Sequence, residues 1–330
     1  MGPGATNGSP EDPHLVSRFS PFNKQLSKMV KTGLISAVCT PLEDDGSLHL
    51  QGLEAHLDAQ WEHGISGLLV GGTMGLMQLQ SNETYAQLIE HSARITKGRG
   101  EVLVGVGDTS FVRTRDRIEL AQRHAIDGLV VVTPSFVKFT TAELIDYYKA
   151  LADFARKPIF IYMLPALTGV TLGYETVLEL SRHPNIRGIK CSVPWDWTRQ
   201  LRELVDPSWR VIPAQPHLID TLIHEGVEEN LDGIFAVFPR LAAGAAHSAR
   251  QGKWQAAADY QSRLSALWRL VTGKYPLFPA CTAILNAVGV EGNVAPLPMR
   301  ALPADERERL LAEPLVQQVI AEEVGSAVVR

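Results

Sequence analysis

The sequence predicts an α/β fold, a (β/α)8 TIM barrel followed by a C-terminal helical extension. Three observations predict it: short β-branched runs alternate with amphipathic helical patterns, the alternation repeats eight times, and each repeat has the spacing of a βαβ unit. With 330 residues and a mass of 36.1 kDa, the chain is long enough for one large barrel with a full core.

The eight repeats can be placed in order along the chain. Strands are expected at residues 34–40, 67–70, 102–106, 128–133, 158–162, 185–192, 210–212 and 233–235. The helical patterns that follow them lie at residues 50–63, 83–95, 114–125, 142–155, 173–181, 199–205, 217–225 and 241–250. From residue 254 to about 311 the chain continues as helices that are punctuated by prolines, so we expect a helical segment packed on the barrel.

Three regions follow from this pattern. Residues 1–30 are rich in Gly, Pro, Ser and Asn and lack the apolar core and cleavage site of a signal peptide, so we expect a loosely packed tail. Residues 31–252 form the expected barrel, and residues 253–330 form the C-terminal helical segment.

Composition excludes several classes of protein. A net charge of -5 and a pI near 6.1, without a basic stripe, argue against nucleic-acid and anionic-membrane binding. No apolar run reaches the roughly 18 residues that span a bilayer. The three cysteines are far apart and odd in number, which favours free thiols and a cytoplasmic location. No metal-ligand spacing, phosphate loop or dinucleotide fingerprint occurs, so we expect neither a metal nor a cofactor.

Three of the expected strands end in chemically unusual residues. Lys190 ends the sixth strand, where an apolar barrel would solvate its ammonium poorly and make the free amine available as a nucleophile. Tyr162 ends the fifth strand, 28 residues earlier, which is about one βα unit. The phenol and the amine should therefore lie at the same height on neighbouring strands, where the phenol can carry protons for the amine. Taken alone, a lysine at a strand end is more often a solvated edge charge.

The second strand leads into Gly-Gly-Thr-Met-Gly at residues 71–75. The exposed amides of such a glycine-flanked turn can hold an anion such as a carboxylate, although the same pattern also occurs in plain turns.

Together these motifs resemble the dihydrodipicolinate synthase and N-acetylneuraminate lyase family of class I aldolases. The resemblance runs from about residue 34 to residue 288. It implies a barrel that assembles as a homotetramer or homodimer, and a lysine, here Lys190, that condenses with the carbonyl of a 2-oxo acid such as pyruvate. It gives Tyr162 the proton-transfer role, and Thr73 with the amide of Met74 the carboxylate site. Gly72 belongs to the same turn.

The chain departs from the family pattern at several positions. Met74 and Leu76 stand where most members have a second hydroxyl residue and a glutamate, and Phe136 stands where the synthases have a relay tyrosine. Leu167 stands in the segment where those synthases carry an arginine for a second carboxylate. The sialic acid lyases hold their sugar with acidic residues after the seventh strand, and residues 214–217 contain none.

The expected mouth of the barrel is apolar. We expect it to be lined by Met163, Leu167, Phe136, Trp195, Phe235 and Phe238, and we place Phe136, Leu167 and Phe235 among the substrate-binding residues. Such a pocket would leave the hydroxyls of a polyol unpaired, at a cost of roughly 1 to 3 kcal/mol each. The same aromatic residues could instead belong to the core or to a subunit contact.

The sequence therefore predicts a Schiff-base-forming lyase that acts on pyruvate or another 2-oxo acid, with an aldehyde partner that is not highly hydroxylated. Two alternatives remain open at this point. One is a dehydratase of a 2-keto-3-deoxy acid, which starts from the same Schiff base. The other is a non-catalytic relative that binds an oxo acid, since Met74, Leu76 and Phe136 replace polar family residues.

Overall fold

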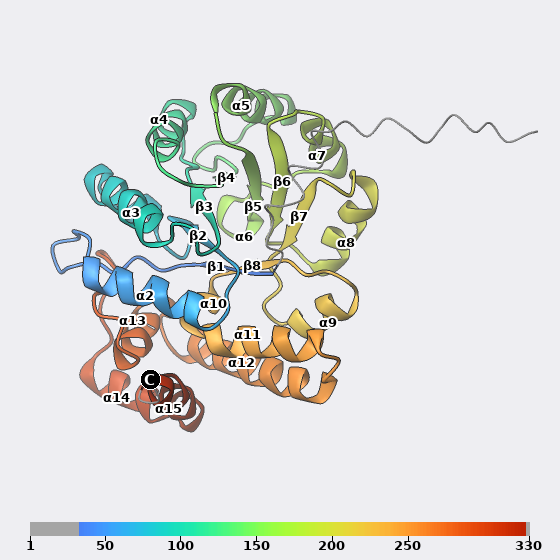
Figure 1. Ribbon diagram of the computed structural model, residues 1–330. Helices are drawn as coiled ribbons and strands as arrows, with labels where there is room; N and C mark the ends of the chain where they lie inside the picture. The colour runs from blue at the N-terminus through green and yellow to red at the C-terminus, as the bar shows by residue number, and fades with distance from the viewer. Residues whose placement is uncertain (1–32, 328–330) are drawn as a thin grey trace, which may run out of the picture. The chain divides into compact units, whose positions relative to one another are not determined.

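The computed structural model describes residues 33–327 of the chain, so the expected tail at residues 1–30 lies outside the described residues. Eight parallel strands form one sheet in the order β7-β6-β5-β4-β3-β2-β1-β8, and helices surround it (Figure 1). The predicted (β/α)8 barrel is confirmed. The strands are β1 (Leu34–Ala37), β2 (Gly67–Val70), β3 (Glu101–Gly105), β4 (Gly128–Val132), β5 (Ile159–Met163), β6 (Ile186–Cys191), β7 (Arg210–Pro213) and β8 (Asn230–Asp232).

The helices that follow the strands begin at side chains suited to cap them. Ser81, Ser110 and Thr140 each accept a hydrogen bond from the backbone N–H three residues later, which satisfies one of the free donors of a helix start. The helices of the barrel are α2 (Leu50–Glu62), η1 (Met77–Leu79), α3 (Asn82–Ile95), α4 (Phe111–Ala121), α5 (Thr141–Phe154), α6 (Pro165–Thr168), α7 (Tyr174–Ser181), α8 (Trp195–Leu204), α9 (Ile219–His224), α10 (Ile234–Val237) and α11 (Pro239–Arg250).

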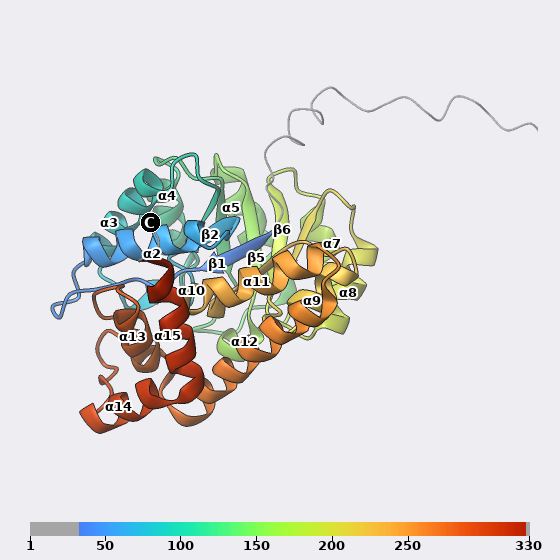
Figure 2. The same ribbon diagram turned by 60° about the horizontal axis from the view of Figure 1, so that its bottom comes forward.

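Four further helices make up the C-terminal extension: α12 (Trp254–Lys274), α13 (Leu277–Ala287), α14 (Ala304–Ala312) and α15 (Pro314–Ala327). α12 packs along α11 and α9, and α13 to α15 gather beside α12 (Figures 1 and 2). No helix in residues 33–327 is both long enough and apolar enough to cross a bilayer.

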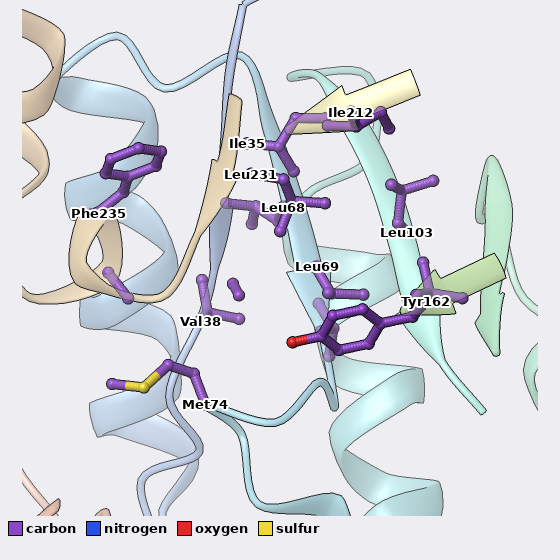
Figure 3. Close-up of a cluster of buried hydrophobic side chains, with 14 of the residues drawn as sticks. Ile35, Val38, Leu68, Leu69, Met74, Leu103, Tyr162, Ile212, Leu231 and Phe235 are labelled. Carbon is purple, nitrogen blue, oxygen red and sulfur yellow. The ribbon is translucent and has the colours of Figure 1, made fainter. Parts of the chain in front are cut away.

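Side chains join β7 to β8, the two strands at the ends of the sheet order. The Asn230 side chain accepts from the Gln215 N–H at 2.9 Å and donates to the Gln215 carbonyl at 2.8 Å, in place of backbone ladder bonds. At the base of the same strands the Arg210 guanidinium pairs with Glu229 at 2.6 Å and with Glu101 of β3 at 2.5 Å. Above this ionic layer, Ile35, Leu103, Ile212 and Leu231 lie together in the buried core (Figure 3).

The predicted position of the eighth strand is wrong. The apolar run at residues 233–235 was expected to be the strand, but β8 is Asn230–Asp232 and the apolar run belongs to the short helix α10. A short apolar run is compatible with a buried strand and with a buried helix, and the residues of α10 are buried on all sides. The helix expected at residues 199–205 begins earlier than predicted, because Trp195 is the first residue of α8.

One buried histidine links the α2 helix to the end of β1. His56 has no exposed surface, and its Nε2 atom accepts a hydrogen bond from the Cys39 N–H at 3.2 Å. Burial lowers the pKa of His56 to about 4, so the ring is neutral in the folded protein near neutral pH.

This histidine should make the fold sensitive to acid. Between its unfolded pKa near 6.5 and its folded pKa near 4, the unfolded chain binds the proton and the folded chain does not. The free energy of unfolding should therefore fall as the pH drops through this window, by on the order of 3 kcal/mol from this residue. Denaturant unfolding of wild type and His56→Gln at several pH values measures this pH dependence of the free energy of unfolding.

The variant should lose this part of the pH dependence, because glutamine does not titrate. His224→Gln, at an exposed position, is the matched control and should keep it. Equal pH slopes for wild type and His56→Gln would contradict the assignment.

Candidate functional site

Lys190 and Tyr162 lie opposite each other on neighbouring strands, as predicted. The β5–β6 register pairs Tyr162 with Lys190, and the Lys190 Nζ atom lies 4.1 Å from the centre of the Tyr162 ring. Both residues are buried, with exposures of 4% for Lys190 and 5% for Tyr162. A phenol and an amine are therefore in contact in a poorly solvated place at the carboxyl ends of the strands.

A register shift near the start of β6 produces this pairing. Ile159 pairs with Ile186, but the next residue, Phe160, pairs with Gly188. Without the shift, Tyr162 would lie beside Ile189 instead of Lys190. A side chain at Gly188 would lie 2.3 Å from the Arg210 carbonyl oxygen, so the close approach of β7 requires a glycine there.

The surroundings of Lys190 contain little negative charge. Among residues 33–327, no carboxylate lies within ion-pair distance of its ammonium. The acidic group that interacts with it electrostatically is Asp232, whose Oδ1 atom accepts from the Ile234 N–H at 3.1 Å. Desolvation raises the pKa of Asp232 above its usual value, and the positive charge of Lys190 opposes the rise. Sequence reasoning missed Asp232 because it placed the eighth strand too late.

Thr73 stands on the other side of the phenol. Its hydroxyl donates to the Tyr162 oxygen at a long distance of 3.5 Å. The turn that carries it is held in place because the Gly75 carbonyl accepts from the side chains of Thr40 at 2.9 Å and Gln80 at 2.6 Å. Gly71 opens the turn at a φ of +61°, where a side chain would be strained.

The backbone of this turn offers donors that the protein leaves unused. Within the described part of the chain, the N–H groups of Thr73 and Met74 donate to no protein acceptor. Two free amides beside a threonine hydroxyl can hold a carboxylate.

A cavity of about 330 Å³ is lined by Thr73 and Tyr162, while Lys190 and Met74 are not among its lining residues. Its polar lining comes mainly from threonines and its apolar lining from leucines, valines and a methionine. The lining residues are Leu69, Gly72, Thr73, Leu76, Met77, Gln78, Leu79, Gly105, Asp108, Thr109, Val130, Val132, Thr133, Ser135, Tyr162, Leu164, Leu167 and Thr168.

The other predicted site residues lie in three places: in the lining of this cavity, on the exposed surface, and in the core. Gly72, Thr73 and Leu167 line the cavity, and Leu167 is 68% exposed at its rim. Phe136 is 84% exposed and is not among the lining residues. Phe235 has no exposed surface and belongs to the core.

Met74 occupies space at the β8 side of the barrel. A side chain at Gly233 would lie 2.2 Å from the Met74 Cγ atom, so the thioether chain packs directly on that glycine. Figure 3 shows Met74 running toward the side of Phe235, while the Tyr162 hydroxyl points to the side where Val38 and Met74 lie. The Met74 side chain therefore fills space, and only its backbone N–H remains for a ligand.

The apolar lining of the cavity comes mainly from leucines and valines rather than from the expected aromatic residues. Of the six side chains expected there, only Leu167 lines the cavity, and leucines from two loops replace the expected aromatic rings. The sequence offered one indication of this lining, since Leu76 and Leu79 come soon after the glycine turn at residues 71–75. Thr133 and Thr168 also line the cavity.

No group of three or more His, Cys, Asp or Glu side chains in residues 33–327 is arranged to hold a metal ion. The chemistry of the site is that of an amine, a phenol, a hydroxyl and two amides. Such a set can form a carbinolamine, carry its protons and hold a carboxylate.

Comparison with known sequences agrees with this geometry. The model of the Dihydrodipicolinate synthetase family matches residues 30–318 of the chain. A 4-hydroxy-tetrahydrodipicolinate synthase of Stenotrophomonas maltophilia (strain K279a) is 31% identical over 275 residues, which cover 83% of this chain and 86% of that protein. A protein of the same name from an Exiguobacterium species is 27% identical over 282 residues, covering 85% and 96% of the two chains.

Solved structures resemble it over similar lengths. YagE of E. coli K12, a prophage protein of the dihydrodipicolinic acid synthase family in complex with pyruvate, has a TM-score of 0.78 and 25% identity. The alignment covers 88% of this chain and 98% of YagE. CdNal of Clostridium difficile, in complex with mannosamine, has a TM-score of 0.80 at 20% identity, covering 89% and 99% of the chains. At that identity the likeness shows the fold.

Proposed function

The chain belongs to the dihydrodipicolinate synthetase family of class I aldolase-type lyases, and from this premise we propose that Lys190 forms a Schiff base with pyruvate or another 2-oxo acid. The partner is an aldehyde that is not highly hydroxylated. The observation that carries the proposal is the buried contact of the Lys190 amine with the Tyr162 ring, beside a cavity that Tyr162 lines.

Each residue has a role in this reaction. The Lys190 amine attacks the carbonyl carbon of the oxo acid, and the carbinolamine loses water to give an iminium. Tyr162 delivers and removes the protons, because its ring contacts the amine and its hydroxyl lies 3.5 Å from the Thr73 hydroxyl. The free amides of Thr73 and Met74, with the Thr73 hydroxyl, hold the carboxylate of the oxo acid.

The departures from the family pattern bear on the partner aldehyde. Leu76 replaces a glutamate and lines the cavity, and Leu167 stands where an arginine would bind a second carboxylate. A second carboxylate would then be buried without a cation, at a cost of several kcal/mol. These contacts favour a partner aldehyde that lacks a second carboxylate.

We also propose that the protein is a homotetramer or homodimer. Phe136, Val137 and Phe139 on the loop after β4, and Phe111 and Val112 at the start of α4, are exposed by 37% to 84%. They follow neighbouring strands, so they lie at the same end of the barrel. Exposed apolar side chains grouped in this way favour a protein contact.

A cytoplasmic location fits the three cysteines, Cys39, Cys191 and Cys281, which are buried and free. Burial raises the pKa of the Cys39 and Cys191 thiols to about 12, so neither provides a second nucleophile near neutral pH.

The nucleophile can be tested directly. Pyruvate followed by borohydride should add one reduced adduct to the protein, and Lys190→Ala should abolish it, because only the Lys190 amine forms the iminium. Intact mass measures the adduct, and the exposed Lys253→Ala is the matched control that should retain it. An adduct of unchanged yield on Lys190→Ala would contradict the assignment of Lys190 as the nucleophile.

The phenol can be tested without knowing the aldehyde. Tyr162→Phe keeps the buried ring but removes the hydroxyl, so it should keep the fold and slow exchange of the pyruvate methyl protons with D2O by about a hundredfold or more. Proton NMR follows the exchange. Tyr174→Phe, on the surface helix α7, should exchange like wild type. A wild-type rate in Tyr162→Phe would remove the phenol from the mechanism.

Two substrates of related enzymes should be poor. The protein should fail to condense pyruvate with aspartate semialdehyde at a useful rate, because the segment at Leu167 offers no guanidinium to the second carboxylate. It should cleave sialic acid poorly, because residues 214–217 offer no carboxylate to the polyol. Product formation measured by mass spectrometry tests both, with the pyruvate adduct as a positive control. Efficient turnover of either substrate would show that the loops after β5 and β7 bind differently.

A further inference from the structure

Two loops give the cavity an apolar wall. Leu76 and Leu79 come from the loop after β2, and Leu164 and Leu167 come from the loop and short helix after β5. Val132 at the end of β4 lines the cavity between them. The wall therefore lies next to the phenol, and Leu76 connects it to the glycine turn.

The hydroxyls in this wall are already used by the protein. Thr133 donates its hydroxyl hydrogen to Thr168 at 3.0 Å. Thr168 in turn donates to the Leu164 carbonyl at 3.0 Å and accepts from the Val170 N–H at 3.2 Å. Neither threonine has a hydroxyl hydrogen left to donate to a ligand.

The two longer polar side chains that line the cavity are also engaged. Gln78 donates to the Gly107 carbonyl at 2.7 Å. Asp108 is 3% exposed, accepts from Arg113 at 2.9 Å through Oδ1 and lies 3.0 Å from Arg117 through Oδ2. Burial alone would raise the pKa of Asp108, but the hydrogen bonds from Arg113 and Thr109 hold it below its usual value. A ligand hydroxyl would therefore compete with Arg113 and Arg117 for the Asp108 carboxylate.

Leu76 belongs both to the apolar wall and to the turn that carries Thr73. It has a φ of +50° and a ψ of +38°, a left-handed conformation that a leucine seldom adopts. Its N–H donates to the Thr73 carbonyl at 3.1 Å, and its carbonyl accepts from the Leu79 N–H at 2.8 Å. The backbone at Leu76 thus sets the positions of Thr73 on one side and Leu79 on the other.

From these contacts, and resting on the Schiff-base chemistry proposed above, we infer that the aldehyde partner carries a hydrocarbon substituent, branched alkyl or aryl. Leu76, Leu79 and Leu167 hold this substituent while the aldehyde carbon faces the iminium of the oxo acid. The substrate in the cleavage direction is then a 4-hydroxy-2-oxo acid with a hydrocarbon group on C4.

The reaction balances without any further reagent. Lys190 condenses with the C2 carbonyl and releases one water. Tyr162 protonates the departing water and becomes a phenolate, which takes the proton of the C4 hydroxyl. The C3–C4 bond then breaks, and its electron pair moves into the iminium to give an enamine as the aldehyde leaves. The enamine is protonated at C3, and one water hydrolyses the iminium to release pyruvate and the free amine.

The test compares aldehydes of matched size in condensation with pyruvate. Isovaleraldehyde and glyceraldehyde have the same number of non-hydrogen atoms, and benzaldehyde provides an aryl probe. Wild type should show a kcat/KM about a hundredfold higher for isovaleraldehyde than for glyceraldehyde, the scale on which an apolar pocket rejects hydroxyls. Benzaldehyde should also exceed glyceraldehyde. An equal or higher value for glyceraldehyde would overturn the inference.

Two variants assign the preference to the wall. Leu167→Asn and Leu79→Asn change side chains that are 68% and 47% exposed, so both proteins should fold. In each, the ratio of the two kcat/KM values should fall by about tenfold. A ratio is insensitive to the fraction of active protein. Leu204→Asn, at an equally exposed leucine on α8, is the matched control and should keep the wild-type ratio. A wild-type ratio in both wall variants would overturn the assignment of these leucines.

Failure of this inference can be told from failure of the proposed function. Exchange of the pyruvate methyl protons with D2O needs Lys190 and the enamine but no aldehyde. Exchange in wild type combined with a preference for glyceraldehyde overturns the hydrocarbon partner alone. Absence of both exchange and the borohydride adduct overturns the Schiff-base chemistry, and the inference with it.

Discussion

The pairing of Tyr162 with Lys190 across β5 and β6 is the constraint on which the site depends. It arises from the register shift after Ile159, and the close packing of Gly188 against Arg210 accommodates it. In a sheet, a slip of one residue turns every side chain to the opposite face. Lys190 would then lose its contact with the phenol, and no neighbouring side chain on β6 could replace it, since Ile189 and Cys191 carry no amine.

The barrel holds that pairing rigid because its two end strands are joined by polar side chains. Asn230 reproduces backbone ladder bonds between β7 and β8 near the mouth, while Arg210 bridges Glu229 and Glu101 at the base. Buried polar groups of this kind stabilise a structure only when all of them are paired. The Lys190 amine is an exception among the buried charges, since no carboxylate in the described chain lies within ion-pair distance of it.

Satisfied polar groups also decide what the cavity accepts. Thr133, Thr168 and Asp108 line it, but both threonines donate their hydroxyl hydrogens within the protein, and the Asp108 carboxylate lies against Arg113 and Arg117. A polar residue type in a pocket wall is therefore a poor guide to the polarity that a ligand experiences. Within the described residues, backbone donors that no protein acceptor uses lie instead at the turn of Thr73 and Met74.

The sequence by itself determined the (β/α)8 fold through its local periodicity, and the length of one βα unit placed Lys190 and Tyr162 near the same height. Their direct pairing depends on the register shift after Ile159, which only the tertiary structure decided. The sequence did not determine the position of β8, since an apolar run such as residues 234–237 fits a buried helix as well as a strand. Nor did it determine which side chains line the mouth. Phe235 is in the core and Phe136 is exposed, while Leu76 and Leu79 line the cavity. Only the tertiary structure decided this, because the direction of a loop side chain depends on the path of its backbone and on contacts with residues distant in sequence.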